Sequence, residues 1–137
     1  MSWLIAARIA IVVTCGAVAV FAGRPLVDAT FRLFDRASVT RIEPAVPHTE
    51  PGLVAAARAL RGGAWIGQFE RAAIFATILA GFPAGIAVVL GLKGLARYPE
   101  LRATSSGAAE RFIIGTFTSV LFACALAGLA WWGVRAV

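Results

Sequence analysis

The sequence predicts an all-α integral membrane protein with three transmembrane helices, a short amphipathic interfacial helix and a proline-containing connector. Three apolar stretches, residues 3–23, 72–92 and 112–134, make up about half of the 137 residues. At about 1.5 Å rise per residue, a helix of about 21 residues spans roughly 31 Å, close to the ~30 Å hydrocarbon core of a bilayer. Hydrophobic residues account for 60% of the chain, whereas soluble domains contain roughly 45–50%.

The net charge of +6 comes mostly from residues that flank the apolar stretches. Basic side chains in such positions are expected to anchor helix ends among lipid headgroups. Nucleic-acid binding needs a basic face on a soluble element, and the sequence suggests none, so the bilayer is the expected partner. Cys15 and Cys124 each fall inside an apolar stretch, and they predict neither a disulfide scaffold nor a zinc site.

Residues 1–37 are expected to form the first transmembrane helix and an amphipathic segment. The alternative for the first span is a secretory signal peptide. After Pro25, Val27 and Phe31 share one helical face, and Asp28 and Arg32 lie on the other at i, i+4 spacing. Such a helix would lie along the membrane surface or pack on another subunit.

Residues 38–64 are expected to form a connector with a short helix. Pro44, Pro47 and Pro51 interrupt any periodic pattern, and they favour extended chain. His48 has no Cys or second His near it and is interpreted as a solvated loop residue.

Residues 65–137 are expected to form a transmembrane helical hairpin. Small residues recur every four positions along both spans, which lets helices approach closely in lipid. They are Ala73, Thr77, Gly81 and Gly85 on the second span, and Gly115, Ser119, Ala123 and Ala127 on the third. Pro83 lies in the middle of the second span, where it predicts a kink or, alternatively, a broken helix at a transport site.

Charged residues are concentrated at the ends of the second and third spans. They are Glu70 and Arg71, Lys93 and Arg97, and Glu110 and Arg111. We expect ion pairs that fix the hairpin, with Glu110 between Lys93 and Arg97, and with Arg71, Arg24 and Arg135 on the side of Glu70. The alternative is a proton relay or ligand site built from Glu70 or Glu110.

Three crossings would place the two chain termini on opposite sides of the membrane. Aromatic residues at headgroup level would then mark two interfaces, with Trp3 and Tyr98 at one, and Trp65, Trp131 and Trp132 at the other. Counts of basic residues around the first and last spans favour opposite orientations, so the sequence leaves the orientation open.

Three stretches resemble a family of small, uncharacterised bacterial inner-membrane proteins. They are Ile66-Gly67-Gln68-Phe69-Glu70-Arg71, Gly91-Leu92-Lys93-Gly94-Leu95-Ala96-Arg97-Tyr98-Pro99-Glu100-Leu101, and Ala109-Glu110-Arg111-Phe112-Ile113-Ile114-Gly115-Thr116. They are similar to the family's IGxxER, KSxARF and AExFxIGT patterns, with Gly94 where a Ser is usual. The resemblance covers residues 63–125 and implies a bacterial inner-membrane location and a paired-helix unit, but no activity.

The sequence contains no recognisable enzyme signature. It has no Ser/His/Asp or Cys/His set, no phosphate-binding glycine loop, and no His within a span to serve as a haem ligand. We therefore expect a non-catalytic structural or assembly subunit of a larger membrane complex. The alternative is an oligomeric small transporter or channel component that uses Glu70 or Glu110. No cofactor is predicted, and bound lipids are compatible with the pattern.

Overall fold

The computed structural model describes residues 2–38, 63–103 and 106–137, and the regular structure in these ranges is entirely α-helical. The helices are α1 (Ser2–Ser38), α3 (Gly63–Leu79), α4 (Gly85–Ala103) and α5 (Ser106–Ala136). The all-α prediction is confirmed. Residues 39–62, which include His48 and most of the predicted connector, lie outside the described residues.

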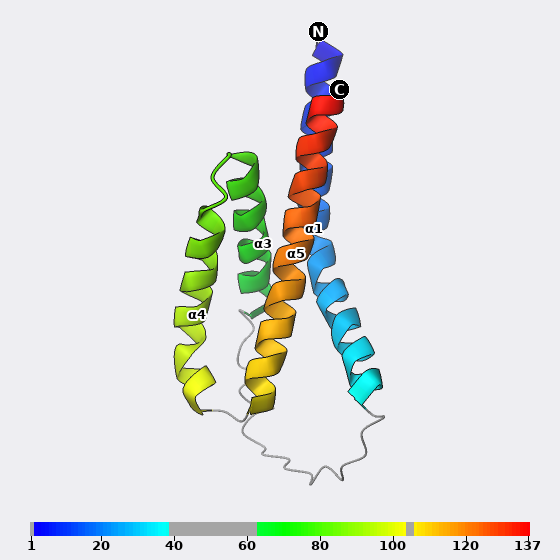
Figure 1. Ribbon diagram of the computed structural model, residues 1–137. Coiled ribbons are helices and arrows are strands. Elements are labelled where there is room, and N and C mark those ends of the chain that lie inside the picture. The colour runs from blue at the N-terminus through cyan, green and yellow to red at the C-terminus, as the bar shows by residue number, and fades with distance from the viewer. Residues whose placement is uncertain (1, 39–62, 104–105) are drawn as a thin grey trace.

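The first 37 residues do not divide into a span and a separate interfacial helix. α1 continues through Pro25 as one helix of 37 residues. Because Pro25 has no N–H, it cannot donate to the carbonyl of Phe21, and Figure 1 shows that α1 bends along its length. The amphipathic segment therefore extends the first apolar helix instead of forming an element of its own.

Two helices, α1 and α5, are long and apolar enough to span a membrane. They run antiparallel along each other: Ile11 of α1 packs beside Gly133 near the end of α5, and Phe31 packs beside Gly115 near its start. α1 is thus the principal neighbour of α5.

The predicted second span is not one helix, and the three-span prediction is wrong at this point. α3 ends at Leu79, and α4 begins at Gly85. Gly81 has a left-handed φ of 72°, which glycine adopts without steric cost. The Phe82 N–H donates to the Thr77 carbonyl at 2.8 Å, and the Gly81 N–H donates to the Ile78 carbonyl at 3.0 Å. This is a Schellman C-cap, and Pro83 follows it where continued helix would lose a hydrogen bond.

The break turns residues 63–103 into an antiparallel helical hairpin whose two legs return to the same end of the bundle (Figure 1). Figure 1 also places the two chain termini together, at what we call the terminal end. The opposite end, where α1 and α4 finish and α3 and α5 begin, we call the basic end. Arg32, Arg36, Arg97, Arg102 and Arg111 lie in the helix segments there. The predicted arrangement, with the two termini on opposite sides, is wrong.

The buried core lies between α1, α3 and α5 and is made of small residues with a few large ones. Ala19, Ala123, Ala127 and Ala130 are fully buried, and Ile74 and Phe75 of α3 fill the space between them. Gly16 lets the Phe75 ring approach α1, since a Cβ there would lie 3.2 Å from Phe75 Cε1. α4 takes no part in this core and packs on α3.

Replacing Gly85 by Ala is expected to destabilise the hairpin by about 1–3 kcal/mol, as overpacking commonly does. A Cβ at this position would lie 2.5 Å from Thr77 Cγ2. The matched control is Gly91→Ala, also in α4, where a Cβ meets nothing within 4 Å and should be neutral or slightly stabilising. The free energy of unfolding, measured by SDS titration in detergent, checks both variants. Thr77→Ser, which removes the clashing methyl, should recover part of the loss. Equal effects at Gly85 and Gly91 would contradict the close contact.

Candidate functional site

Arg71 is a buried charged residue that joins three helices. Its side chain leaves α3 with 4% exposure and extends between α1 and α5. Nε and Nη2 donate to the carbonyl oxygen of Val20 at 3.2 and 2.9 Å, and Nη1 donates to Ser119 Oγ at 3.3 Å. Gly23 makes room for the guanidinium, since a Cβ there would lie 2.4 Å from Arg71 Cδ and Nε. Arg71 therefore holds α1, α3 and α5 together.

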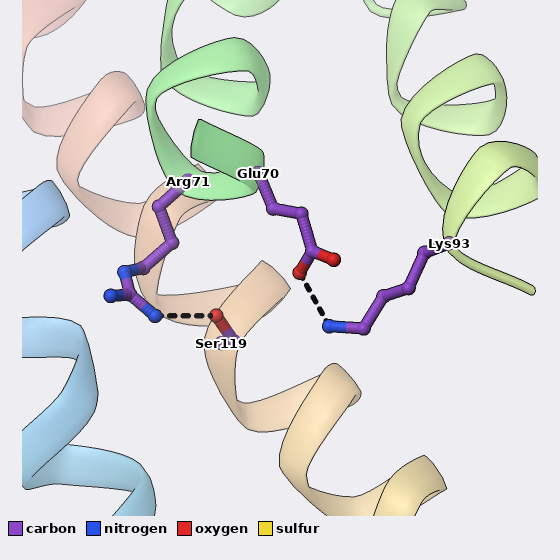
Figure 2. Close-up of polar contacts among 4 residues, drawn as sticks. All are labelled: Glu70, Arg71, Lys93 and Ser119. Carbon is purple, nitrogen blue, oxygen red and sulfur yellow. Dashed lines mark hydrogen bonds and ion pairs between the residues drawn. The ribbon is translucent and has the colours of Figure 1, made fainter. Parts of the chain in front are cut away.

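Glu70, the neighbour of Arg71, points to the other side of α3. Figure 2 shows the two side chains diverging, with Glu70 directed at Lys93 of α4. Glu70 Oε2 accepts a hydrogen bond from Lys93 Nζ in an ion pair whose side chains are 12% and 20% exposed. Lys93 Nζ also lies 5.7 Å from the centroid of the Phe112 ring. This ion pair links the two legs of the hairpin, α3 and α4.

A cavity of about 410 Å³ opens beside these residues, and all four helices contribute to its walls. Its charged lining residues are Arg24 and Asp28 from α1, Glu70 and Arg71 from α3, Lys93 from α4 and Arg111 from α5. Four cations face two carboxylates, so the lining carries a formal charge of +2. Val27, Phe31, Ile66 and Phe112 supply apolar wall.

Thr116 adds an unusual polar group to the wall of this cavity. Its Oγ1 is buried and has no hydrogen-bond partner among the described residues. No other buried side-chain oxygen or nitrogen in this part of the chain lacks one. A helical Thr hydroxyl can donate to a carbonyl of the preceding turn, as Thr30 does to Leu26 at 3.0 Å, but Thr116 makes no such bond in the described helix. The cavity thus contains an unused hydroxyl next to its charged groups.

The charged residues predicted at the helix ends differ in their placement from the expected pattern. Lys93 pairs with Glu70 and not with Glu110, which is exposed and does not line the cavity. Arg111 lines the cavity with its guanidinium 5.8 Å from the Phe31 ring centroid. The side chain of Arg97 lies outside the described residues.

Arg135 is at the terminal end, whereas Glu70 is near the middle of the bundle beside Arg71, which donates hydrogen bonds to Val20 and Ser119, so the expected grouping is wrong. Arg135 stacks at 3.5 Å over the ring centroid of Trp131 near the end of α5. The expectation assumed three crossings, which would have brought the end of α5 and the start of α3 to the same side. Of the three arginines expected near Glu70, Arg24 and Arg71 do share its cavity.

The two rows of small residues have different roles. On α5, Gly115 packs against Val27 and Phe31, Ser119 accepts the Arg71 hydrogen bond, and Ala123 and Ala127 are fully buried. That row faces α1 and α3. In the hairpin, Ala73 lines a groove between α3 and α4, Thr77 contacts Gly85, and Gly81 forms the turn with nothing within 4 Å of its Cβ position. The first half of the expected second span, α3, does pack on α5, but α1 is the principal neighbour of α5, and the second half, α4, packs on α3.

The aromatic residues predicted as interface anchors are exposed on the described helices. They are Trp3, Trp65, Tyr98, Trp131 and Trp132. Trp3 is at the terminal end with Trp131 and Trp132, whereas Trp65 and Tyr98 are in helix segments of the basic end. The predicted grouping of Trp3 with Tyr98 is wrong, because α3 and α4 form a hairpin in place of one continuous second helix.

Several residues of the site were not singled out from the sequence. Arg24 was expected near Glu70 but was not assigned to a cavity, and Gly23, Val20 and Thr116 received no role. A signal for Gly23 does exist: Gly16, Ala19 and Gly23 follow i, i+3, i+7 spacing on the first span, which places three small residues on one helical face.

The arrangement can bind an anion more readily than it can perform acid–base chemistry. Its two carboxylates face a larger number of cations, and Glu70 is held by Lys93. In the described part of the chain, no group of three or more His, Cys, Asp or Glu side chains could hold a metal ion. Comparison with protein families, with curated proteins and with solved structures finds no match for this chain. The family resemblance based on the three motifs stays a prediction.

Replacing Gly23 by Ala is expected to destabilise the protein by about 1–3 kcal/mol, because the new Cβ displaces the Arg71 side chain from its hydrogen bonds. The matched control is Gly128→Ala in α5, where a Cβ meets nothing within 4 Å. We expect the control to be neutral or stabilising by up to about 1 kcal/mol. SDS-induced unfolding of the two variants provides the comparison, and a neutral Gly23→Ala would exclude the tight contact with Arg71.

Proposed function

We propose that this chain is a multi-pass protein of a bacterial inner membrane with a non-catalytic role, a small subunit that packs against a larger membrane complex. The non-catalytic role is supported by one observation: the buried polar side chains bind other groups of the protein. Arg71 binds a backbone carbonyl and Ser119, and Glu70 and Lys93 bind each other. These groups hold helices together and leave no acid and base poised around a reacting atom.

The membrane location is supported by where the apolar side chains point. The apolar windows of α1 and α5 are 6% and 17% buried, whereas the core helix of a soluble protein is mostly buried. Large hydrophobic side chains such as Phe21, Phe117 and Leu121 are more than 60% exposed. Soluble proteins rarely expose apolar surface on this scale, and lipid would cover it.

The position of the hairpin supports an inside orientation of the basic end. The sequence alone gave conflicting counts because a crossing second span separates Arg32 and Arg36 from Lys93 and Arg111. With both legs of the hairpin returning to the same end, these basic residues lie together, and Arg8 and Arg135 are at the other end. The positive-inside rule then assigns the basic end to the cytoplasm.

Cysteine labelling tests this topology. In a background of Cys15→Ala and Cys124→Ala, single cysteines at Ser2, Val137 and Arg36 should react differently with a membrane-impermeant maleimide added to spheroplasts. We expect labelling of Ser2→Cys and Val137→Cys from outside, and of Arg36→Cys only after lysis. Labelling of the two terminal cysteines from opposite sides would restore the three-crossing arrangement and refute the proposal.

The subunit role is tested by the size and composition of the protein extracted in mild detergent. We expect a tagged chain expressed at its natural level to elute with a fixed stoichiometry in a complex much larger than its 14.3 kDa. A monodisperse monomer or homo-oligomer without partners would overturn the subunit role.

A transporter component is the second candidate, and the Glu70–Lys93 pair beside the cavity is the observation in its favour. Against it, the buried residues beyond Ser119 toward the terminal end are apolar, including Ala19, Ala123 and Ala127. A single copy therefore has no polar path across. Proteoliposome flux that is lost in Glu70→Gln and kept in Glu110→Gln, whose carboxylate is exposed, would favour the transporter.

A further inference from the structure

We propose that the cavity at the basic end and a groove next to it together bind one anionic phospholipid, with its phosphate in the cavity and an acyl chain in the groove. This inference rests on the membrane location proposed above. It goes beyond the subunit role, because it assigns a ligand and the residues that recognise it.

The charge of the cavity fits a phosphate diester, which carries one negative charge. Lys93 is neutralised by Glu70, and Arg71 is occupied with Val20 and Ser119 but keeps its positive charge. Arg24 and Arg111 then face the remaining carboxylate, that of Asp28. Phosphate oxygens accept charge-assisted hydrogen bonds from guanidinium groups, often two at a time.

The unused hydroxyl of Thr116 supplies a further recognition element. Its Oγ1 is buried without a partner among the described residues, on the wall of the same cavity. A buried hydroxyl without a partner is costly, and it could donate a hydrogen bond to a phosphate oxygen within reach. The cavity thus offers positive charge and a neutral donor to the same anion.

The two arginines line the cavity at different depths. Phe31 of α1 packs beside Gly115 of α5, Arg24 comes seven residues before Phe31, and Arg111 comes four residues before Gly115. Because α1 and α5 run antiparallel, Arg111 starts near the basic end, and Arg24 starts roughly 16 Å deeper at about 1.5 Å per residue. A phosphate beside Arg111 would lie near the headgroups, where a basic pocket between helices can bind an anionic lipid, and the long Arg24 side chain would extend toward it.

The adjoining groove explains why the ligand should carry an acyl chain. It has a volume of about 310 Å³ between α3 and α4 and is walled by Phe69, Ala73, Val89 and Leu92. Glu70 and Lys93 line both spaces, as do Ile66 and Ala96, so the charged cavity and the apolar groove meet at the ion pair. Phe69 and Leu92 are 67% and 64% exposed, which leaves the groove open to the side from which a lipid would enter.

Native mass spectrometry of the delipidated full chain tests the proposal. The probes are phosphatidylglycerol, phosphatidylcholine with the same acyl chains, and inorganic phosphate. We expect phosphatidylglycerol to bind about tenfold more tightly than phosphatidylcholine, and the double variant Arg24→Gln/Arg111→Gln to weaken its binding by about 10- to 30-fold. The matched control, Arg32→Gln/Arg36→Gln, removes the same charge from exposed positions outside the cavity and should change binding by less than about threefold.

A second pair of variants tests the groove. Leu92→Gln should weaken phosphatidylglycerol binding by about three- to tenfold, because it places a polar group on the path of the acyl chain. Leu95→Gln, on an exposed position of the same helix outside the groove, is the control. Both substituted side chains are exposed, so folding should be preserved, which SDS-induced unfolding verifies.

Three results would overturn the inference. The first is equal affinity for phosphatidylglycerol and phosphatidylcholine, and the second is an equal loss in the two double arginine variants. The third is binding of inorganic phosphate as tight as that of phosphatidylglycerol with no effect of Leu92→Gln, which would make the cavity a site for a soluble anion. Because the measurement uses the purified chain alone, it does not depend on whether a larger complex is found.

Discussion

Replacing Glu70 by Gln is expected to destabilise the protein by about 3 kcal/mol, the largest effect of any single exposed or half-buried carboxylate in the described chain. The substitution keeps the size of the side chain but leaves the Lys93 ammonium mostly buried without a counter-ion. Removing one partner of a buried pair costs more than the pair itself contributes, because the remaining charge keeps its desolvation cost. The free energy of unfolding in detergent measures the effect.

The control for this prediction is Glu110→Gln, which removes an exposed carboxylate near the start of α5 and should cost less than about 0.5 kcal/mol. The double variant Glu70→Gln/Lys93→Met should recover most of the lost stability, since it removes the uncompensated charge as well. If Glu70→Gln and Glu110→Gln have the same small effect, then the ion pair does not hold the two legs of the hairpin together.

Replacing Arg71 by Met is expected to cost about 2–4 kcal/mol, because the variant loses charge-assisted hydrogen bonds to Val20 and Ser119 while keeping an unbranched side chain. Ser119→Ala removes one of these bonds and should cost about 1 kcal/mol. Stability measured by SDS titration should therefore fall in the order wild type, Ser119→Ala, Arg71→Met.

Gly23 provides an internal check on the role of Arg71. The clash expected in Gly23→Ala is with the Arg71 side chain itself, at 2.4 Å from Cδ. In an Arg71→Met background, the flexible methionine can move away, so Gly23→Ala should lose most of its effect. Such non-additivity is the mark of residues in direct contact. Additive effects of the two substitutions would contradict the contact between α1 and α3 at this point.

The first and last apolar helices were predictable because their patterns are long and uninterrupted. The second was misread at Gly81-Phe82-Pro83, where the local signals compete with the apolar pattern. Apolar residues continue on both sides of Pro83, so hydropathy predicts one helix. The residue before a proline avoids helical geometry, and a glycine can adopt the left-handed conformation of a C-cap, so local chemistry predicts an end. The structure follows the local chemistry.

The error in the second span accounts for the error in the candidate site. In a continuous helix, Glu70 and Lys93 would lie about 35 Å apart, so neither could be assigned to the other. The hairpin brings them together. The sequence did contain evidence against three crossings, because the basic residues around the first and third spans favoured opposite orientations. That conflict disappears in the observed fold, where both legs of the hairpin return to the same end of the bundle.

The cavity could not have been derived from sequence, because four helices contribute to it and their contacts depend on the hairpin. Arg24 and Thr116 carry no local pattern that distinguishes them from other flanking or helical residues. Only the packing of α5 against α1 and α3 brings them to the same space.

The turn at Gly81 also bears on how the chain would enter a membrane during synthesis. With residues 24–71 on the inside, a crossing second span would require the segment from Lys93 to Arg111, which contains four basic residues, to be moved through the hydrocarbon. Each such residue costs about 2.5–3.5 kcal/mol at the centre of a bilayer on insertion scales. A hairpin that enters and leaves on one side avoids this transfer entirely. The turn at Gly81-Phe82-Pro83 would thus remove the need to translocate four basic residues during membrane insertion.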